Sequence, residues 1–233
     1  MEHEHSILYE PFNNYIWRHA FGFDVPDHVI MALLVLLISA IVFPLMSRRI
    51  SRDNPSGFQQ LLELVVGGLK ALLQDIVGPH SDRFQYIIGG FAVFIFISNL
   101  FGLFFFLQPP TGNTNTTFAL SIMAFLYYNY VGIRKQGVGQ YLAHFAGPIW
   151  WLAPLMFPIE LIGHFARVLS LGMRLFGNIF GEHTATGIFM GILPFLVPWR
   201  MMGLGIFGAF LQTFVFIMLT MVYIGGAVAT EEH

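Results

Sequence analysis

The chain has no cysteine and few charged residues. Of its 233 residues none is Cys, and only 10% are Asp, Glu, Lys or Arg, whereas a soluble domain carries roughly 25%. The missing cysteines exclude disulfides, thiolate metal sites and a cysteine nucleophile. The formal net charge of -2 leaves no basic surface for nucleic acid. Because 56% of the residues are hydrophobic, the composition predicts an integral membrane protein whose chemistry takes place in or beside the bilayer.

Long apolar runs fill most of the chain. We expect five membrane-spanning helices, at residues 29–46, 86–107, 115–132, 158–193 and 200–228. As one upright helix, 158–193 would extend about 50 Å, which exceeds a hydrocarbon core of about 30 Å. Pro158 suits a helix start, and Pro194–Trp199 forms a tight link to the last segment. The pattern predicts an all-α integral membrane protein with a single membrane domain, whose last two helices form a long, tilted antiparallel hairpin.

Segment 58–77 differs from the spans because it is amphipathic. Polar or small residues recur on one of its faces, opposite a Leu/Val face; they are Gln60, Glu63, Gly67, Lys70 and Gln74. We expect a helix that lies on the cytoplasmic interface of the membrane. A helix that packs against a soluble partner is the alternative.

The positions of the cations predict the orientation of the chain. Lys and Arg are retained on the cytoplasmic side of a membrane. Most cations then lie inside, namely Arg48, Arg49, Arg52, Lys70, Arg83, Arg134 and Lys135. Residues 1–28 do not have the basic and then apolar pattern of a cleavable signal. We therefore expect an extracytoplasmic N-terminal segment 1–28 and a cytoplasmic C-terminus.

A permanently charged guanidinium, that of Arg174, lies in the middle of an apolar run. A charge at mid-membrane costs at least ~2.5–3.5 kcal/mol, so such a residue marks a functional site with a partner or a water-filled cavity. Snorkelling to the interface works near helix ends, and Arg174 is far from both ends of its segment. The sequence therefore predicts that the function centres on this arginine.

Further polar groups share the helical face of Arg174. At about 100° per residue they fall within about 40° of the direction of Glu160; the set is Glu160, His164, Arg167, Arg174, Asn178 and Glu182. The track extends about 33 Å along the helix axis, close to the thickness of the apolar core. His183 lies off this stripe. Arg167 either pairs with Glu160 or His164 or takes part in transport, and Gln212 on the second arm could simply bond between helices.

Several motifs resemble subunit a of the F-type ATP synthase, of the bacterial type. The main ones are the run Leu169–Asn178, the run Leu211–Phe216 and the C-terminal Glu-Glu-His. Ser98-Asn99-Leu100 and Pro158-Ile159-Glu160 are similar to other family motifs. The resemblance implies a non-catalytic stator subunit in the bacterial plasma (inner) membrane. It would hold two offset half-channels against a rotating c-ring, beside membrane lipid and b-type peripheral stalk subunits that lead to the F1 head.

The resemblance also implies roles for single residues. In that family the arginine at the position of Arg174 is essential, and the glutamine at the position of Gln212 lies near it. Asn178 matches the family asparagine near the arginine, Glu160 a carboxylate of the cytoplasmic half-channel, and Asn99 a polar residue on a neighbouring helix. Many bacterial relatives carry Glu at the position of His183 and His at that of Gly205. Here Glu182 and His183 are both candidates for the outer relay, and the choice between them stays open.

The fixed charge of Arg174 suggests a mechanism. A protonated carboxyl on the c-ring is neutral in lipid, and meeting Arg174 within ~4–6 Å lowers its pKa and releases the proton. We expect an inlet through Glu182 and His183, exchange beside Arg174 and Gln212, and an outlet past Glu160 and His164. No cofactor is expected.

Two other functional classes are weaker. An autonomous ion-coupled secondary transporter would use the polar stripe as a substrate path, but inverted repeats and paired broken helices are not visible. An intramembrane hydrolase would need a nucleophile with a base or a metal motif such as HExxH, which the sequence lacks.

Overall fold

The structure, a computed structural model, describes residues 25–48, 50–51, 55–78, 81–104, 107–139, 141, 150–190 and 197–228. These residues form helices and their connections, in the order α3 (Asp27–Ser47), α4 (Gly57–Val77), η2 (Ser81–Phe84), α5 (Gln85–Phe101), η3 (Pro110–Gly112), α6 (Thr114–Gln136), η4 (Trp150–Leu152), α8 (Ala153–Met190) and α9 (Val197–Val228). Five of them, α3, α5, α6, α8 and α9, are long and apolar enough to cross a membrane. The prediction of an all-α membrane protein is confirmed. Most of the N-terminal segment 1–28 and the C-terminal Glu-Glu-His lie outside the described residues.

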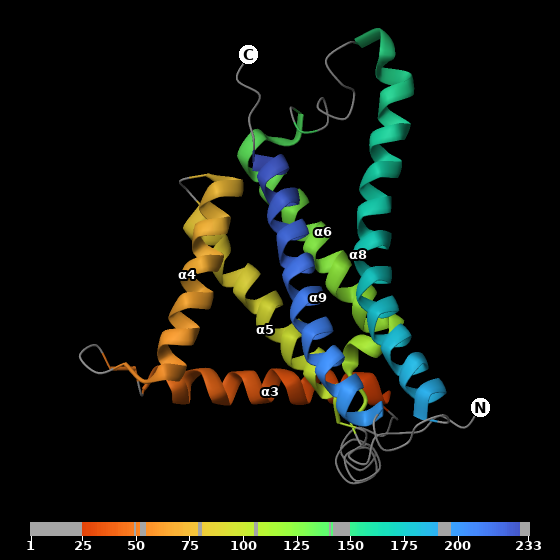
Figure 1. The fold of residues 1–233 in the computed structure, drawn as a ribbon. Helices are drawn as coiled ribbons and strands as arrows, with labels where there is room; N and C mark the ends of the chain where they lie inside the picture. Colours follow the sequence, from red (N-terminus) through yellow and green to blue (C-terminus); the bar gives the residue numbers. More distant parts are fainter. Residues whose placement is uncertain are drawn as a thin grey trace.

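Helices α5, α6, α8 and α9 pack side by side around one apolar core (Figure 1). Helices α8 and α9 run antiparallel, as the hairpin prediction requires. Helix α3 lies crosswise to α4, α8 and α9, and α4 packs against α9. The largest fully buried side chains of the core come from α4, α5, α8 and α9; among them are Leu73, Ile88, Ile95, Leu175, Phe216 and Met221.

Two glycines let backbones approach closely. A Cβ on Gly172 of α8 would lie 3.0 Å from Ser121 Oγ of α6, and a Cβ on Gly225 of α9 would lie 2.9 Å from the carbonyl oxygen of Ile76 in α4. Helices in membranes associate through such small residues, because lipid tails provide no hydrophobic drive between them. These contacts fix α6 against α8 and the end of α4 against α9.

Some helix ends differ from the predicted ones. Helix α8 begins at Ala153, so Pro158 lies inside the helix and not at its start. The expectation of a helix start came from the cost of an interior proline, which loses the hydrogen bond to residue i−4 and crowds that carbonyl. Pro198 lies near the start of α9, so residues 197–199 of the predicted link are helical, and 191–196 lie outside the described residues.

Helix α5 ends at Phe101, earlier than the predicted residue 107, while α6 continues to Gln136, beyond the predicted residue 132. At the end of α5 the backbone N–H of Gly102 donates to the carbonyl of Asn99, which tightens the last turn into a 3-10 arrangement. Hydropathy alone does not reveal such a turn, because the residues after it are still apolar.

Side chains at the C-terminal end of α6 form hydrogen bonds with the C-terminal end of α9. Lys135 Nζ donates to the carbonyl of Val228 at 2.7 Å, and Gln136 Nε2 donates to that of Ala227 at 3.1 Å. These bonds satisfy carbonyls that a helix C-terminus leaves without partners, and the ammonium complements the helix dipole. The contact holds the ends of α6 and α9 together beside the cavity described next.

Candidate functional site

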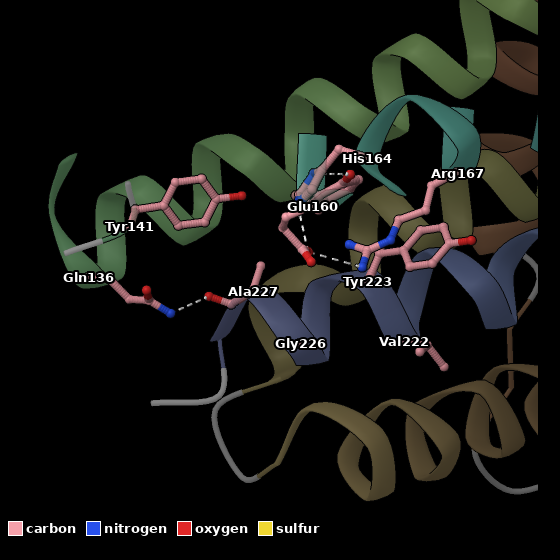
Figure 2. Close-up of a pocket in the computed structure, with 10 residues that line it drawn as sticks. Gln136, Tyr141, Glu160, His164, Arg167, Val222, Tyr223, Gly226 and Ala227 are labelled. Atoms are coloured by element: carbon pink, nitrogen blue, oxygen red, sulfur yellow. Dashed lines mark hydrogen bonds and ion pairs between the residues drawn. The ribbon is translucent and has the colours of Figure 1, made fainter. Parts of the chain in front are cut away.

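A polar cavity of about 270 Å³ lies where α6, α8 and α9 meet (Figure 2). Its lining combines a carboxylate, an imidazole, a guanidinium and three phenols with small apolar residues; the lining residues are Tyr128, Gln136, Tyr141, Glu160, His164, Arg167, Val222, Tyr223, Gly226 and Ala227. Such a density of ionisable groups within membrane helices is typical of a functional site.

The side chain of His164 is buried and is held from two sides. Its Nδ1 lies 3.0 Å from the hydroxyl of Tyr128, and its Nε2 lies 3.5 Å from Glu160 Oε1, one turn earlier on α8. Arg167 Nη2 lies 3.6 Å from the same carboxylate oxygen, and its guanidinium stacks over the ring of Tyr223 at 5.5 Å. Figure 2 shows Glu160 between His164 and Arg167. The predicted pairing of Arg167 with Glu160 is therefore present.

Tyr141 forms one wall of this cavity. Its hydroxyl donates to Asn129 Oδ1 at 2.7 Å, and its ring lies over Gly132, where an added Cβ would come within 2.6 Å of the ring. Burial raises the pKa of Tyr141 to about 12, so the phenol stays protonated and acts as a donor. The sequence analysis missed Tyr128, Tyr141 and Tyr223. The Tyr-Tyr-Asn-Tyr run of α6 was the available signal, but only packing shows which of its rings faces α8.

A second polar cluster lies toward the other end of the hairpin. The carboxylate of Glu182 occupies the space that Gly205 of α9 leaves, because a Cβ there would overlap Glu182 Oε1. A Cβ on Gly208 would lie 3.6 Å from Asn178 Nδ2 and 4.0 Å from Glu182 Oε2. Glycines on α9 thus make room for two polar side chains of α8.

His183 points away from Glu182, toward the turn after α5. A Cβ on Gly102 would lie 3.5 Å from His183 Nε2. In the same part of α5, Asn99 Oδ1 accepts a hydrogen bond from Thr111 at 2.7 Å. Asn99 Nδ2 and the hydroxyl of Ser98 are buried with no hydrogen-bond partner among the described residues. Buried polar atoms are normally satisfied by a protein group or by water, so these two atoms mark a polar spot in an otherwise apolar helix.

Arg174 and Gln212 lie between the two clusters. The contacts of Glu182 with Gly205 and of Asn178 with Gly208 fix the antiparallel register. Arg174 is about one turn before Asn178 on α8, and Gln212 is about one turn after Gly208 on α9. Because the helices are antiparallel, Arg174 and Gln212 lie at the same level. Arg174 is exposed on the surface of the chain, whereas Gln212 is buried and its Nε2 has no partner within the described part of the structure. The neighbouring hydroxyls of Thr213 and Thr220 donate to carbonyls of α9 itself.

Comparison with known proteins decides the family. The model of the ATP synthase A chain family matches residues 28–225. The chain belongs to this family. It is 41% identical to ATP synthase subunit a of Trichlorobacter lovleyi over 98% of this chain and 99% of that protein. It is 46% identical to ATP synthase subunit a 1 of Syntrophotalea carbinolica (91% and 89%) and 42% identical to ATP synthase subunit a of Geobacter sulfurreducens (85% and 86%).

Membership of the ATP synthase A chain family gives the polar clusters their context. The chain is a multi-pass membrane protein and the Fo proton-translocating subunit of an ATP synthase complex. The cavity beside Glu160 and His164, the cluster around Glu182 and the exposed Arg174 between them are the polar features of this hairpin.

Proposed function

We propose that this chain is the non-catalytic stator subunit of a rotary ATP synthase, with two half-channels that Arg174 separates. The observation that carries the proposal is the order of polar groups along the hairpin. An inner cavity with Glu160 and His164 lies at one end, and Asn178 and Glu182 lie toward the other. Arg174 is exposed between them, on a surface that a partner can reach.

The partner that we propose at Arg174 is the c-ring. Residues of α8 that flank the arginine on its exposed side are small; they include Ser170, Gly177 and Gly181. Small residues let a neighbouring helix approach closely within a membrane. A ring carboxyl can therefore come near the guanidinium, while bulky side chains would hold it away.

The arrangement of the helices supports a steep tilt of the hairpin. Helix α8 has 38 residues and is about 57 Å long, while the hydrocarbon core measures about 30 Å. Helix α3 lies crosswise to α8 and α9 (Figure 1), and with 21 residues it matches the core when upright. With α3 along the membrane normal, α8 and α9 run at a steep tilt, which places a long stretch of both helices beside the ring.

Helix α4 fits the cytoplasmic membrane interface. It also lies crosswise to α3, and its one buried side chain is Leu73, near its C-terminal end. Phe58, Leu61 and Leu64 are exposed, as suits a helix with one face in lipid. The cations of Arg83, Arg134 and Lys135 on the same side support an orientation with the N-terminus outside and the C-terminus in the cytoplasm of a bacterial plasma membrane. The b-type stalk subunits and, through them, the F1 head are the further proposed partners.

The proton route follows from this orientation. A proton enters from the outside through Glu182 or His183 and reaches an ionised ring carboxyl near Asn178. The neutral carboxyl then travels through lipid until the ring brings it to the other side of Arg174. There the guanidinium favours the carboxylate form, and the released proton leaves past His164 and Glu160. Because Arg174 stays charged at any physiological pH, it blocks a direct leak between the two paths.

The proximity of Arg174 to the ring can be tested by crosslinking. Because the chain has no cysteine, a Cys introduced at Gly177 is the only thiol in it. We expect oxidation to join Gly177→Cys to a Cys in the outer helix of the ring subunit, in the whole complex. Phe165→Cys is the matched control, since Phe165 is also exposed but lies about 180° from Arg174 around α8. Crosslinking at Phe165 and none at Gly177 would show that the ring contacts the face of α8 opposite Arg174, which would contradict the proposal.

The outer path is tested with His183→Leu, which keeps the volume and removes the titratable ring. We expect proton flux through reconstituted Fo, driven by a potassium diffusion potential, to fall about tenfold or more, within the range of one positioned acid or base. The amount of assembled complex should change little, because His183 lies outside the buried core. Unchanged flux would assign the relay to Glu182 alone.

An autonomous secondary transporter is the alternative function, and one experiment separates the two. Purified chain alone, in proteoliposomes with an imposed proton gradient, should not move protons or take up solutes. Addition of the ring should restore proton flux. Transport by the chain alone would contradict the stator role.

A further inference from the structure

We propose that Tyr128 is a positioning residue of the outlet, which holds the ring of His164 in one orientation so that Nε2 carries each departing proton to Glu160. This inference rests on the outlet proposed above and names the side chains that conduct through it. It follows from the contacts that the two ring nitrogens of His164 make with Tyr128 and Glu160. Tyr128 lies on α6, whereas His164 and Glu160 lie on α8.

The two nitrogens of His164 have different environments. Nδ1 faces the phenol of Tyr128 at 3.0 Å, and both of these side chains are buried. Nε2 faces Glu160 at 3.5 Å, and the side chain of Glu160 is 39% exposed and lines the cavity. The chain of contacts therefore runs from the buried hydroxyl of Tyr128 to the partly exposed carboxylate of Glu160.

The hydrogen bond at Nδ1 fixes the orientation of the His164 ring, because the hydroxyl of Tyr128 can accept from Nδ1–H or donate to Nδ1. The oxygen of Tyr128 can accept the Nδ1–H bond both when His164 is neutral and when it is an imidazolium. The ring then keeps one orientation throughout the cycle. Nε2 is the basic atom, and it points toward the carboxylate in both states.

Each proton that His164 takes up in this cycle is released again, and His164 needs no separate step to return to its starting state. A proton that arrives through the cavity from the side of Arg174 forms an N–H bond at Nε2, and His164 becomes an imidazolium. That N–H bond then breaks, and the proton moves to Glu160 Oε1, which becomes a carboxylic acid. Glu160 releases the proton to the cytoplasm and is a carboxylate again. His164 returns to the tautomer in which it began, because Nδ1 never loses its proton.

The neighbours of His164 support separate roles for Nδ1, which is held in place, and Nε2, which transfers the proton. The charged and titratable groups that face it are Tyr128 from α6, Glu160 and Arg167 from α8, and Tyr223 from α9, together with Tyr141 beyond α6. Arg167 contacts Glu160 and stacks on Tyr223, so it holds the acceptor in place. The hydroxyl of Tyr141 donates to Asn129. Tyr128 is the side chain that contacts Nδ1 of the imidazole.

The test compares Tyr128→Phe with Tyr130→Phe in the whole reconstituted complex. Both substitutions remove one hydroxyl from α6, but that of Tyr130 is exposed and accepts a bond from Arg134. We measure passive proton conductance between pH 5 and 9, a range that brackets the ordinary histidine pKa of about 6.5. Tyr128→Phe should conduct about fivefold less, the factor that corresponds to one lost hydrogen bond, and its pH profile should move. Tyr130→Phe should match the unsubstituted protein in both respects.

A double substitution separates positioning from general damage. His164→Gln alone should lower conductance and remove the histidine inflection, and Tyr128→Phe should add nothing in that background. Additive losses, or a Tyr128→Phe profile identical to that of the unsubstituted protein, would overturn the relay while leaving the stator role intact. If the unsubstituted complex itself conducts no protons, the proposed function fails instead.

Discussion

Replacement of Arg174 by alanine is expected to abolish proton-driven ATP synthesis while the complex still assembles. An opposite charge within about 4–6 Å lowers a carboxyl pKa by about 1–3 units. Loss of the arginine therefore raises the ratio of protonated to ionised ring carboxyl by a factor of about 10 to 1,000. The ring then carries its proton past the outlet without releasing it. At the same time the fixed positive barrier between the two half-channels disappears.

Assembly should survive because Arg174 is exposed and does not belong to the apolar core. The measurement is ATP synthesis by membrane vesicles under an imposed proton gradient, with the amount of complex determined on native gels. Arg134→Ala is the matched control, since it also removes an exposed arginine, at the end of α6. It should synthesise ATP at close to the normal rate. Normal synthesis by Arg174→Ala would remove the arginine from the mechanism.

Replacement of Gly205 by leucine should have the second-largest effect, because it fills the space that the Glu182 carboxylate occupies. A single Cβ at Gly205 would already overlap Glu182 Oε1, and it would lie 2.6 Å from Leu103 Cδ2. The carboxylate must then leave its place between α8 and α9. We expect proton flux to fall by about 100-fold, in the range that general acid–base groups contribute when they are positioned.

Gly203→Leu is the control for added volume on the same helix. Gly203 is exposed, and no atom lies within 4 Å of a Cβ built there. Flux through Gly203→Leu should stay within about twofold of normal, as for a surface substitution away from special features. The measurement is dye-monitored proton uptake into vesicles, at equal amounts of complex. If Gly205→Leu conducts normally, the Glu182 carboxylate is not part of the inlet.

The sequence predicted those features of the structure that depend on a single helix. Hydropathy predicted the five apolar helices, and they are present because each satisfies its own backbone hydrogen bonds whatever surrounds it. Helical periodicity placed Glu160, His164 and Arg167 on one face, and the structure brings these side chains together, since residues three and four apart meet on a helix surface. Helix ends were less well predicted, as at Phe101, because apolar residues continue past the turn.

By itself, then, the sequence determined the class of the protein, its five apolar helices and the charged stripe around Arg174, since bilayer thickness and helical period act locally. Only the tertiary structure decided which side chains from other helices complete the two clusters. Tyr128 reaches His164 because Gly172 lets α6 approach α8, and Glu182 turns toward Gly205 while His183 turns toward Gly102. Adjacent residues on a helix point about 100° apart, and the packing of neighbouring helices sets what each of them meets.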